Sequence, residues 1–165
     1  MTLLSIDNLE LGAGCGKFGK IFFNPCILTD NDQKIQSYCS ESEIDVFCEA
    51  EHTPFDPKQF KLILICNPYN YGFLNLDQSI LLMTEINRIL KNRGKIIVIT
   101  HESNIYANYD AISTRVPVFQ RILGIKLNVY SKEYDPKDFP GHKFYICKNV
   151  RETKPNQYIE IEMEE

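Results

Sequence analysis

Short apolar runs alternate with helical patterns along most of this chain of 165 residues. This alternation is typical of βα units arranged around a mostly parallel sheet, so it predicts an α/β fold. The apolar runs predict strands at Ser5–Leu11, Cys26–Asp30, Ile44–Cys48, Lys61–Cys66 and Lys95–Thr100. Two later runs, Lys126–Ser131 and Lys143–Lys148, are expected to form an antiparallel pair that closes the sheet.

The clearest helical pattern covers Leu76–Lys91, where apolar residues recur at intervals of three and four. The segment Lys91-Asn92-Arg93-Gly94 supplies the basic residues and the glycine that are typical of a helix end. A second helix is expected within Asn104–Leu123, interrupted or kinked by a proline, and a short one at about Lys17–Phe23. The region Glu51–Gln59 contains two prolines and is predicted to be a loop.

The end of the chain differs in composition from the rest. No internal repeat or linker divides residues 1–150, which we therefore expect to form one domain. Residues 151–165 hold five glutamates against Arg151 and Lys154, so they carry −3 of the net charge of −4. We expect this acidic tail to be disordered. The alternative is an edge strand, because Tyr158-Ile159-Glu160-Ile161 alternates in polarity.

The charge, hydropathy and cysteine patterns argue against several classes of protein. The body of the chain is nearly neutral, so nucleic-acid binding is not expected. No run of 18 apolar residues and no signal-peptide pattern occurs, so neither a membrane span nor export is expected. The six cysteines form no Cys-x-x-Cys pair and no zinc-finger spacing with a histidine, so no metal site is predicted. Buried, reduced cysteines are expected instead, which is typical of a cytoplasmic protein.

Four of the eight glycines lie together after the first predicted strand, in Glu10-Leu11-Gly12-Ala13-Gly14-Cys15-Gly16-Lys17-Phe18-Gly19. A strand that runs into glycines is a place where the backbone turns sharply and approaches a ligand closely. A dinucleotide-binding loop would need a glycine where Lys17 stands, so the NAD fingerprint is not met. Glu10 disfavours a pyrophosphate and suits a ligand with positive charge, such as S-adenosylmethionine. A purely structural glycine turn is the alternative.

Polar residues follow the next three predicted strands. The second strand ends in Asp30-Asn31-Asp32, and an acid at this place can bind both hydroxyls of a ribose. A solvated turn is the alternative for this segment. The third strand leads into Glu49 and Ala50, and the fourth leads into Asn67-Pro68-Tyr69. Since parallel strands end at the same edge of a sheet, these segments are expected to lie together where open α/β folds bind ligands.

In this order, the segments resemble those of class I S-adenosylmethionine-dependent methyltransferases. The resemblance implies S-adenosylmethionine as cofactor and a Rossmann-like α/β fold, with a mostly parallel seven-stranded sheet and a final antiparallel strand. The matching stretches are Leu9–Gly16, Asp30, Glu49–Phe55, Phe60–Tyr69 and Ile89–Val98.

The resemblance also implies how the matched residues would bind the cofactor. The glycines of the loop would pass under its methionine part, and Glu10 would lie near the amine. Asp30 would bind the ribose, while Glu49 and the amide of Ala50 would read the edge of the adenine. The implied cofactor-binding residues are Glu10, Gly12, Gly14, Gly16, Asp30, Asn31, Glu49, Ala50 and Asn67.

The segment Asn67-Pro68-Tyr69 resembles a shortened Asn-Pro-Pro-Tyr motif of enzymes that methylate planar or amide nitrogens. In those enzymes the asparagine side chain and a proline carbonyl accept hydrogen bonds from the nitrogen, and the aromatic ring stacks on the acceptor. The resemblance implies Asn67 and Tyr69 as catalytic residues and a nitrogen, rather than an oxygen, as methyl acceptor. A buried Asn-Pro turn is the alternative. His101, directly after the fifth predicted strand, is the candidate base.

We therefore predict a methyltransferase whose site lacks the usual cap, which suits a large or carrier-bound acceptor such as a protein or peptide. A small acceptor would need a lid, which a second copy in a homodimer would supply. The competing hypothesis is a non-catalytic binding or regulatory module that keeps the fold and acts through a protein partner. The short segment between Asp30 and Ile44 and the altered Asn-Pro-Tyr motif favour that module.

Overall fold

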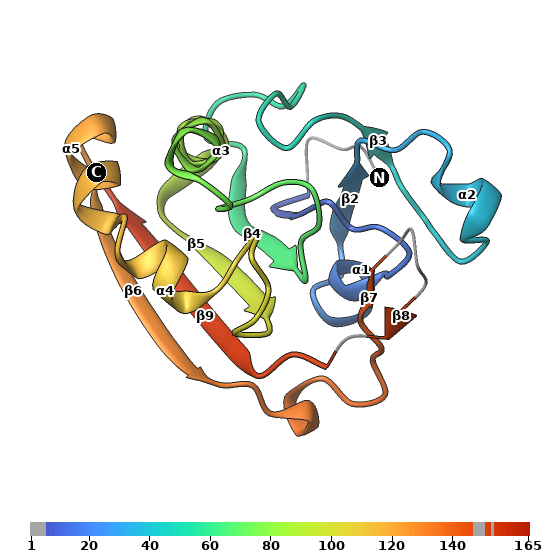
Figure 1. Cartoon of the computed structure of the whole chain (residues 1–165). Coiled ribbons are helices and arrows are strands. Elements are labelled where there is room, and N and C mark those ends of the chain that lie inside the picture. The colour runs from blue at the N-terminus through green and yellow to red at the C-terminus, as the bar shows by residue number, and fades with distance from the viewer. Residues whose placement is uncertain (1–5, 147–150, 153) are drawn as a thin grey trace.

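Figure 1 shows the computed structural model, which describes residues 6–146, 151–152 and 154–165. Its main sheet has seven strands in the order β3-β2-β1-β4-β5-β9-β6. Strands β1 to β5 pair in parallel, and β9 runs antiparallel to both of its neighbours. This is the mostly parallel seven-stranded sheet that the sequence predicted. The strands are β1 (Asn8–Leu11), β2 (Cys26–Asp30), β3 (Val46–Phe47), β4 (Phe60–Cys66), β5 (Leu90–Thr100), β6 (Lys126–Glu133) and β9 (Gln157–Glu164).

Four of the helices lie where the sequence predicted them, whereas α2 and η2 were not predicted. The longest, α3, begins after Asn75, whose side chain accepts a hydrogen bond from the backbone N–H of Gln78. The predicted interruption of the second helix separates α4 from α5, and residues 51–59 form the predicted loop. No helix in the described part of the chain is long and apolar enough to cross a membrane. The helices are α1 (Phe18–Phe22), α2 (Ile35–Tyr38), α3 (Leu76–Ile89), α4 (Tyr109–Ser113), α5 (Val116–Leu123) and the short 3₁₀ helix η2 (Pro136–Asp138).

Alternate residues of each strand point to opposite faces of the sheet, and each face has its own core. On one face Ile63 and Ile65 pack with buried residues of α3, α4 and α5. On the other face Leu64 packs with Phe18 of α1 and with aromatic side chains from residues 134–144. The rings of Phe18 and Phe139 lie 4.9 Å apart in this second core. Aromatic side chains thus cover much of the face against which α1 packs.

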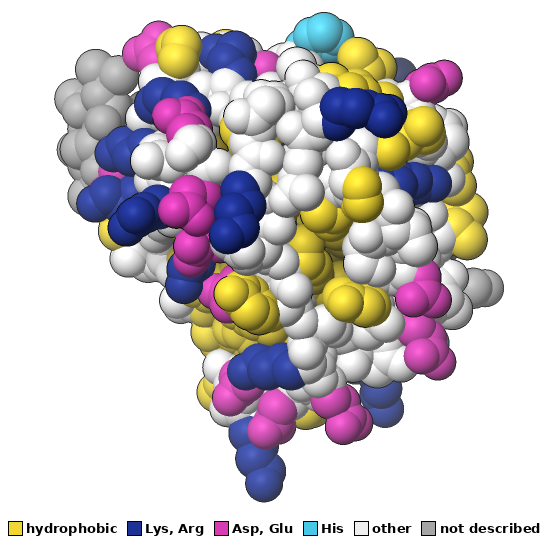
Figure 2. All heavy atoms as spheres, turned by 90° about the vertical axis from the view of Figure 1, so that its left-hand side faces the viewer, with side chains coloured by type: hydrophobic (Ala, Val, Ile, Leu, Met, Phe, Trp, Pro, Cys, Tyr) yellow, Lys and Arg dark blue, Asp and Glu magenta, His cyan; other side chains and the backbone are white. Residues whose placement is uncertain are grey.

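The side of the molecule formed by α5 and β6 shows hydrophobic side chains among acidic and basic ones (Figure 2). Ile122 of α5 is 50% exposed, and Tyr130 of β6 is 61% exposed. Scattered exposed apolar residues of this kind are common on soluble proteins.

The structure corrects the prediction for the acidic tail. Residues 157–164 form β9, which lies between β5 and β6 and is neither disordered nor at an edge of the sheet. Ile159, Ile161 and Met163 are at most 4% exposed, and the glutamates between them point to the more open face. The alternation in polarity was therefore the informative signal, and the acidic composition was misleading.

The predicted closing pair of strands is also wrong. The first member, β6, pairs with β9 rather than with the run at Lys143–Lys148. The described part of that run contains β7 (Tyr145–Ile146), which pairs with β8 (Arg151–Glu152) in a separate two-stranded sheet. Residues 147–148 lie outside the described residues. Local pattern cannot choose between partners that are distant in sequence.

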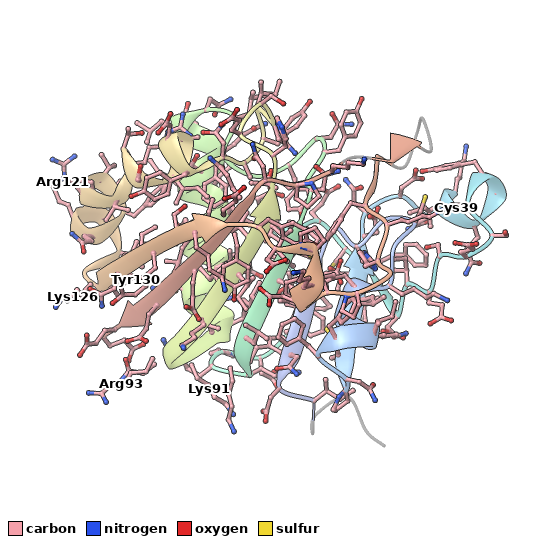
Figure 3. All side chains as sticks on the ribbon, turned by 90° about the horizontal axis from the view of Figure 1, so that it is seen from below. Cys39, Lys91, Arg93, Arg121, Lys126 and Tyr130 are labelled. Atoms are coloured by element: carbon pink, nitrogen blue, oxygen red, sulfur yellow. The ribbon has the colours of Figure 1, made fainter. Side chains whose placement is uncertain are left out.

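The predicted C-terminal turn of α3 belongs to β5 instead. The helix ends at Ile89, and Leu90 already pairs with Phe60 of β4. Lys91 and Arg93 extend outward at the beginning of β5 (Figure 3), and the Lys91 ammonium lies 3.4 Å from a carboxylate oxygen of Asp7. Strand pairing therefore overrides a sequence that is typical of a helix end.

We expect Ile161→Ala to lower the free energy of unfolding by about 2–4 kcal/mol, because a buried side chain is replaced by a cavity in the middle of the sheet. Glu162→Ala, on the same strand, should change it by less than about 0.5 kcal/mol. Urea unfolding followed by circular dichroism measures both values. Equal effects of the two substitutions would contradict the position of β9.

Candidate functional site

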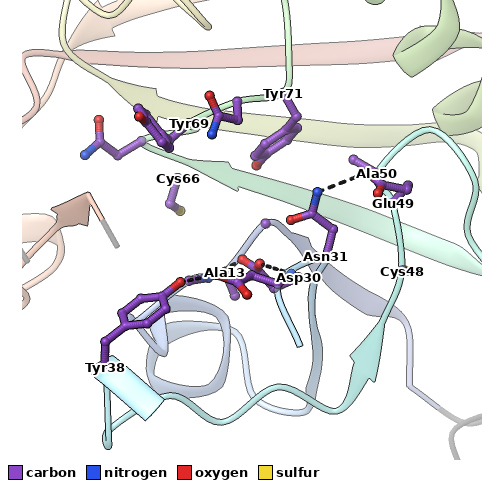
Figure 4. Close-up of a pocket in the computed structure, with 15 residues that line it drawn as sticks. Ala13, Asp30, Asn31, Tyr38, Cys48, Glu49, Ala50, Cys66, Tyr69 and Tyr71 are labelled. Carbon is purple, nitrogen blue, oxygen red and sulfur yellow. Dashed lines mark hydrogen bonds between the residues drawn. The ribbon is translucent and has the colours of Figure 1, made fainter. Parts of the chain in front are cut away.

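A cavity of about 330 Å³ lies at the carboxyl ends of β1, β2, β3 and β4 (Figure 4). This is the sheet edge at which the sequence predicted a ligand site. Each of the four strands leads into a segment that contributes to the lining, and α2 adds one tyrosine. The lining residues are Gly12, Ala13, Gly14, Asp30, Asn31, Asp32, Tyr38, Cys48, Glu49, Ala50, Cys66, Asn67, Tyr69, Asn70 and Tyr71.

Most of the predicted site residues meet in this cavity, but Glu10, Gly16 and His101 are not among its lining residues. Glu10 is 1% exposed, and its carboxylate accepts a hydrogen bond of 2.6 Å from the N–H of Gly19. Gly16 lies beside the ring of His142. A Cβ atom added to Gly16 would lie 3.9 Å from that ring. His101 pairs through Nδ1 with the hydroxyl of Ser103, at 2.7 Å. The structure therefore places these three residues outside the lining of the cavity.

The glycine loop has the left-handed backbone that favours glycine, with φ of 56° at Gly12 and 62° at Gly14. The sequence predicted a close approach of a ligand at this loop, but at Gly12 the neighbour is the ring of Tyr71. A Cβ atom on residue 12 would lie 2.3 Å from that ring. The Tyr71 hydroxyl donates a hydrogen bond of 2.7 Å to the carbonyl of Leu11. Gly12 is thus required by packing within the chain, whereas the N–H of Gly14 donates to Asp30 at 3.0 Å.

The wall formed after β2 and β3 is acidic. Both oxygens of Asp30 accept backbone hydrogen bonds, from Gly14 at 3.0 Å and from Asp32 at 2.9 Å. Burial raises the pKa of Asp30, although these hydrogen bonds act in the opposite direction. Asn31 donates to Glu49 at 3.1 Å and so links the two strand ends. Among the described residues, the lining contains three carboxylates and no lysine or arginine, which favours a ligand with positive charge.

The opposite wall, after β4, is neutral. Asn67 has a φ of 47° and is 7% exposed, and its Oδ1 accepts a hydrogen bond of 3.1 Å from Nδ2 of Asn104. The same Nδ2 donates to the carbonyl of Pro68 at 3.1 Å. Tyr69 is 40% exposed and packs edge-on against Tyr106, with ring centres 5.5 Å apart. Both oxygens that the Asn-Pro-Tyr motif offers thus already accept hydrogen bonds within the chain.

Sequence reasoning missed Asn104 and Tyr71 as parts of this site. Asn104 lies 37 residues beyond Asn67, in the segment that follows β5, and it contacts the motif only through the fold. No local pattern marks such a residue. For Tyr71 a signal exists, because it stands four residues after Asn67 in a segment predicted to follow a strand at the ligand edge.

No protein-family model matches the sequence, and no curated protein matches it either. Solved structures do match the fold. A SAM-dependent methyltransferase from Thermotoga maritima is 16% identical, with a TM-score of 0.58, over 99% of this chain and 84% of that one. A SAM-dependent methyltransferase from Archaeoglobus fulgidus is 13% identical, with a TM-score of 0.58, over 94% of this chain and 85% of that one.

A third match is phosphoethanolamine N-methyltransferase 1 from Haemonchus contortus, solved with phosphoethanolamine and S-adenosylhomocysteine. It is 16% identical, with a TM-score of 0.57, over 96% of this chain and 39% of that one. This chain therefore has the fold of the class I S-adenosylmethionine-dependent methyltransferases.

Burial raises the pKa of Glu10 to about 8 from 4.5, against the hydrogen bond from Gly19. Between these two values folding takes up a proton, so Glu10 makes the protein less stable as the pH rises. Between these two pKa values, the free energy of unfolding falls by up to about 1.4 kcal/mol for each unit that the pH rises. We expect Glu10→Gln to reduce the fall in melting temperature between about pH 5 and pH 8. An unchanged pH dependence in the variant would show that Glu10 ionises normally in the folded protein.

Proposed function

We propose that this protein binds S-adenosylmethionine in the cavity and transfers its methyl group to an acceptor. The observation that carries the proposal is the meeting of Gly14, Asp30 and Glu49 in one cavity at the carboxyl ends of the strands. In this proposal Asp30 and Asn31 bind the ribose, while Glu49 and Ala50 contact the adenine. The matched structure that was solved with S-adenosylhomocysteine supports this choice of ligand.

The charges of the cavity suit this cofactor. When bound, S-adenosylmethionine supplies a methyl group on a sulfonium that is already an activated leaving group. The three carboxylates of the lining favour a ligand that carries sulfonium and ammonium charges. Most of the rate of such a transfer can come from holding the acceptor in line with the methyl group. The proposal therefore needs no base, and it gives no step to His101, which lies outside the lining.

Tyr69 is the residue that we propose to meet the acceptor, since its ring lines the cavity and is 40% exposed. A nitrogen acceptor stays a prediction from the motif. Its expected hydrogen-bond partners, Asn67 and the carbonyl of Pro68, both accept from Asn104. A large or carrier-bound substrate, a homodimer that supplies a lid and a cytoplasmic location stay predictions from the sequence.

The same two hydrogen bonds favour the second candidate function, a module that binds the cofactor without catalysis and acts through a protein partner. Incubation of the protein with cell extract and S-adenosylmethionine labelled in the methyl group separates the two functions. An enzyme transfers label to extract components and releases S-adenosylhomocysteine. If the protein binds S-adenosylhomocysteine but transfers no label, this result would contradict the proposed methyltransferase activity and support the module.

Titration calorimetry with S-adenosylhomocysteine tests the cofactor assignment. We expect the wild-type protein to bind it and Gly14→Val to lose binding, because the branched side chain would enter the cavity from a loop position with φ of 62°. The same variant is the control for label transfer. Absence of binding to the wild-type protein would overturn the proposed function, and wild-type affinity in Gly14→Val would move the ligand away from this loop.

Asp30→Ala should weaken S-adenosylmethionine and S-adenosylhomocysteine equally, because both contain the ribose. The loss of hydrogen bonds to a charged acceptor should cost about 1.5–3 kcal/mol, which is roughly a tenfold to hundredfold loss of affinity. Asp32→Ala, which alters the neighbouring lining carboxylate, is the matched control and should have a smaller effect. A larger effect of Asp32→Ala would reassign the ribose to that residue.

A further inference from the structure

The neutral wall of the cavity contains a buried amide of which one end is engaged and the other is not. Oδ1 of Asn67 accepts a hydrogen bond from Asn104 at 3.1 Å. Nδ2 of Asn67 is buried and has no hydrogen-bond partner among the residues that the structure describes. A buried N–H donor without a partner is unfavourable, so such a group in the lining of a cavity suits a ligand that accepts hydrogen bonds.

The direction of the Asn67 amide follows from the hydrogen bonds of Asn104. The backbone N–H of Tyr106 can only donate, and it meets one end of the Asn104 side chain at 2.9 Å, so that end is the oxygen. The other end of Asn104 is therefore its NH₂ group, which donates to Asn67 and to Pro68. Asn67 must turn its oxygen toward Asn104, so its own NH₂ group is the end that has no partner among the described residues.

The segment that holds Asn104 is itself anchored to the sheet and to the segment after β4. The hydroxyl of Thr100 donates to the carbonyl of Ala107 at 2.7 Å, and the N–H of Phe73 donates to the carbonyl of Tyr106 at 2.6 Å. The N–H of Asn104 donates to the carbonyl of His101 at 2.9 Å. These bonds hold the Asn104 amide in place, so the direction of Asn67 is set by the folded structure before any ligand arrives.

Two other polar side chains of the lining already donate within the chain, while Tyr69 and Asn70 of the same wall are exposed. The amide of Asn31 donates to Glu49, and the hydroxyl of Tyr71 donates to the carbonyl of Leu11. Within the described parts of the chain, no lysine or arginine lines the cavity. An anionic group on a ligand would be repelled by the acidic wall after β2 and β3, and on the opposite wall it would meet the donor of Asn67.

We propose that Asn67, oriented by Asn104, binds the carboxylate of the methionine part of the cofactor. This inference rests on the proposed function. If ribose and adenine bind at the ends of β2 and β3, the methionine part would lie toward the ends of β1 and β4, the next strands in the sheet, and Asn67 follows β4. The carboxylate is the anionic group of that part, and a neutral N–H donor is a suitable partner for it where no described lining residue is cationic. Asn104 is a positioning residue, which acts through Asn67.

The test compares S-adenosylhomocysteine with its decarboxylated analogue, in which hydrogen replaces the carboxylate, by titration calorimetry. Asn67→Asp keeps an oxygen for Asn104 and places a second oxygen where Nδ2 stood. We expect it to weaken S-adenosylhomocysteine by at least about tenfold and the analogue by less than about threefold. Asn67→Ala should weaken S-adenosylhomocysteine less than Asn67→Asp does, because it removes the donor without adding repulsion.

Asn104→Ala provides an independent variant, because it frees the Asn67 amide to turn. In the wild-type protein, the affinity for S-adenosylhomocysteine divided by the affinity for the analogue measures the contribution of the carboxylate. We expect Asn104→Ala to reduce this ratio by about threefold or more. A purely structural role of Asn104 would leave this ratio unchanged. Equal losses for both ligands in Asn67→Asp, or an unchanged ratio in Asn104→Ala, would overturn the inference while leaving the proposed function intact. Failure of the wild-type protein to bind S-adenosylhomocysteine would overturn both.

Discussion

The parallel pairing of β1 with β2 on one side and with β4 on the other is the constraint on which the site depends. It brings the carboxyl ends of these strands to one edge, where the chain changes direction across the sheet. The turn after β1 must then be narrow, and Gly12 and Gly14 supply the left-handed backbone for it. The hydrogen bond from Gly14 to Asp30 ties this turn to the end of β2.

The cavity that results has two chemically different walls. The segments after β2 and β3 supply carboxylates, and the segment after β4 supplies amides and tyrosine rings. This division gives a ligand an orientation as well as a place, since its cationic and anionic groups prefer different walls. The pair formed by Asn67 and Asn104 adds to this division, because Asn104 determines which end of the Asn67 amide accepts a hydrogen bond within the chain.

The other half of the sheet supports this edge from a distance. Strand β9 hydrogen-bonds along both sides, to β5 and to β6, and so keeps β5 away from the edge of the sheet. The end of β5 leads into the segment with Asn104, whose position therefore depends on the pairing of the last residues of the chain. A segment rich in glutamate is buried on one face because its apolar residues alternate.

The sequence by itself determined the parallel sheet, the glycine turn and most of the residues that line the cavity. These features depend on local patterns and on the rule that parallel strands end at one edge. Tertiary structure decided the burial of Glu10, the contact of Tyr71 with Gly12, the place of β9 and the hydrogen bonds of Asn104. Each of these depends on residues distant in the sequence, and for such contacts local propensity and spacing carry no information.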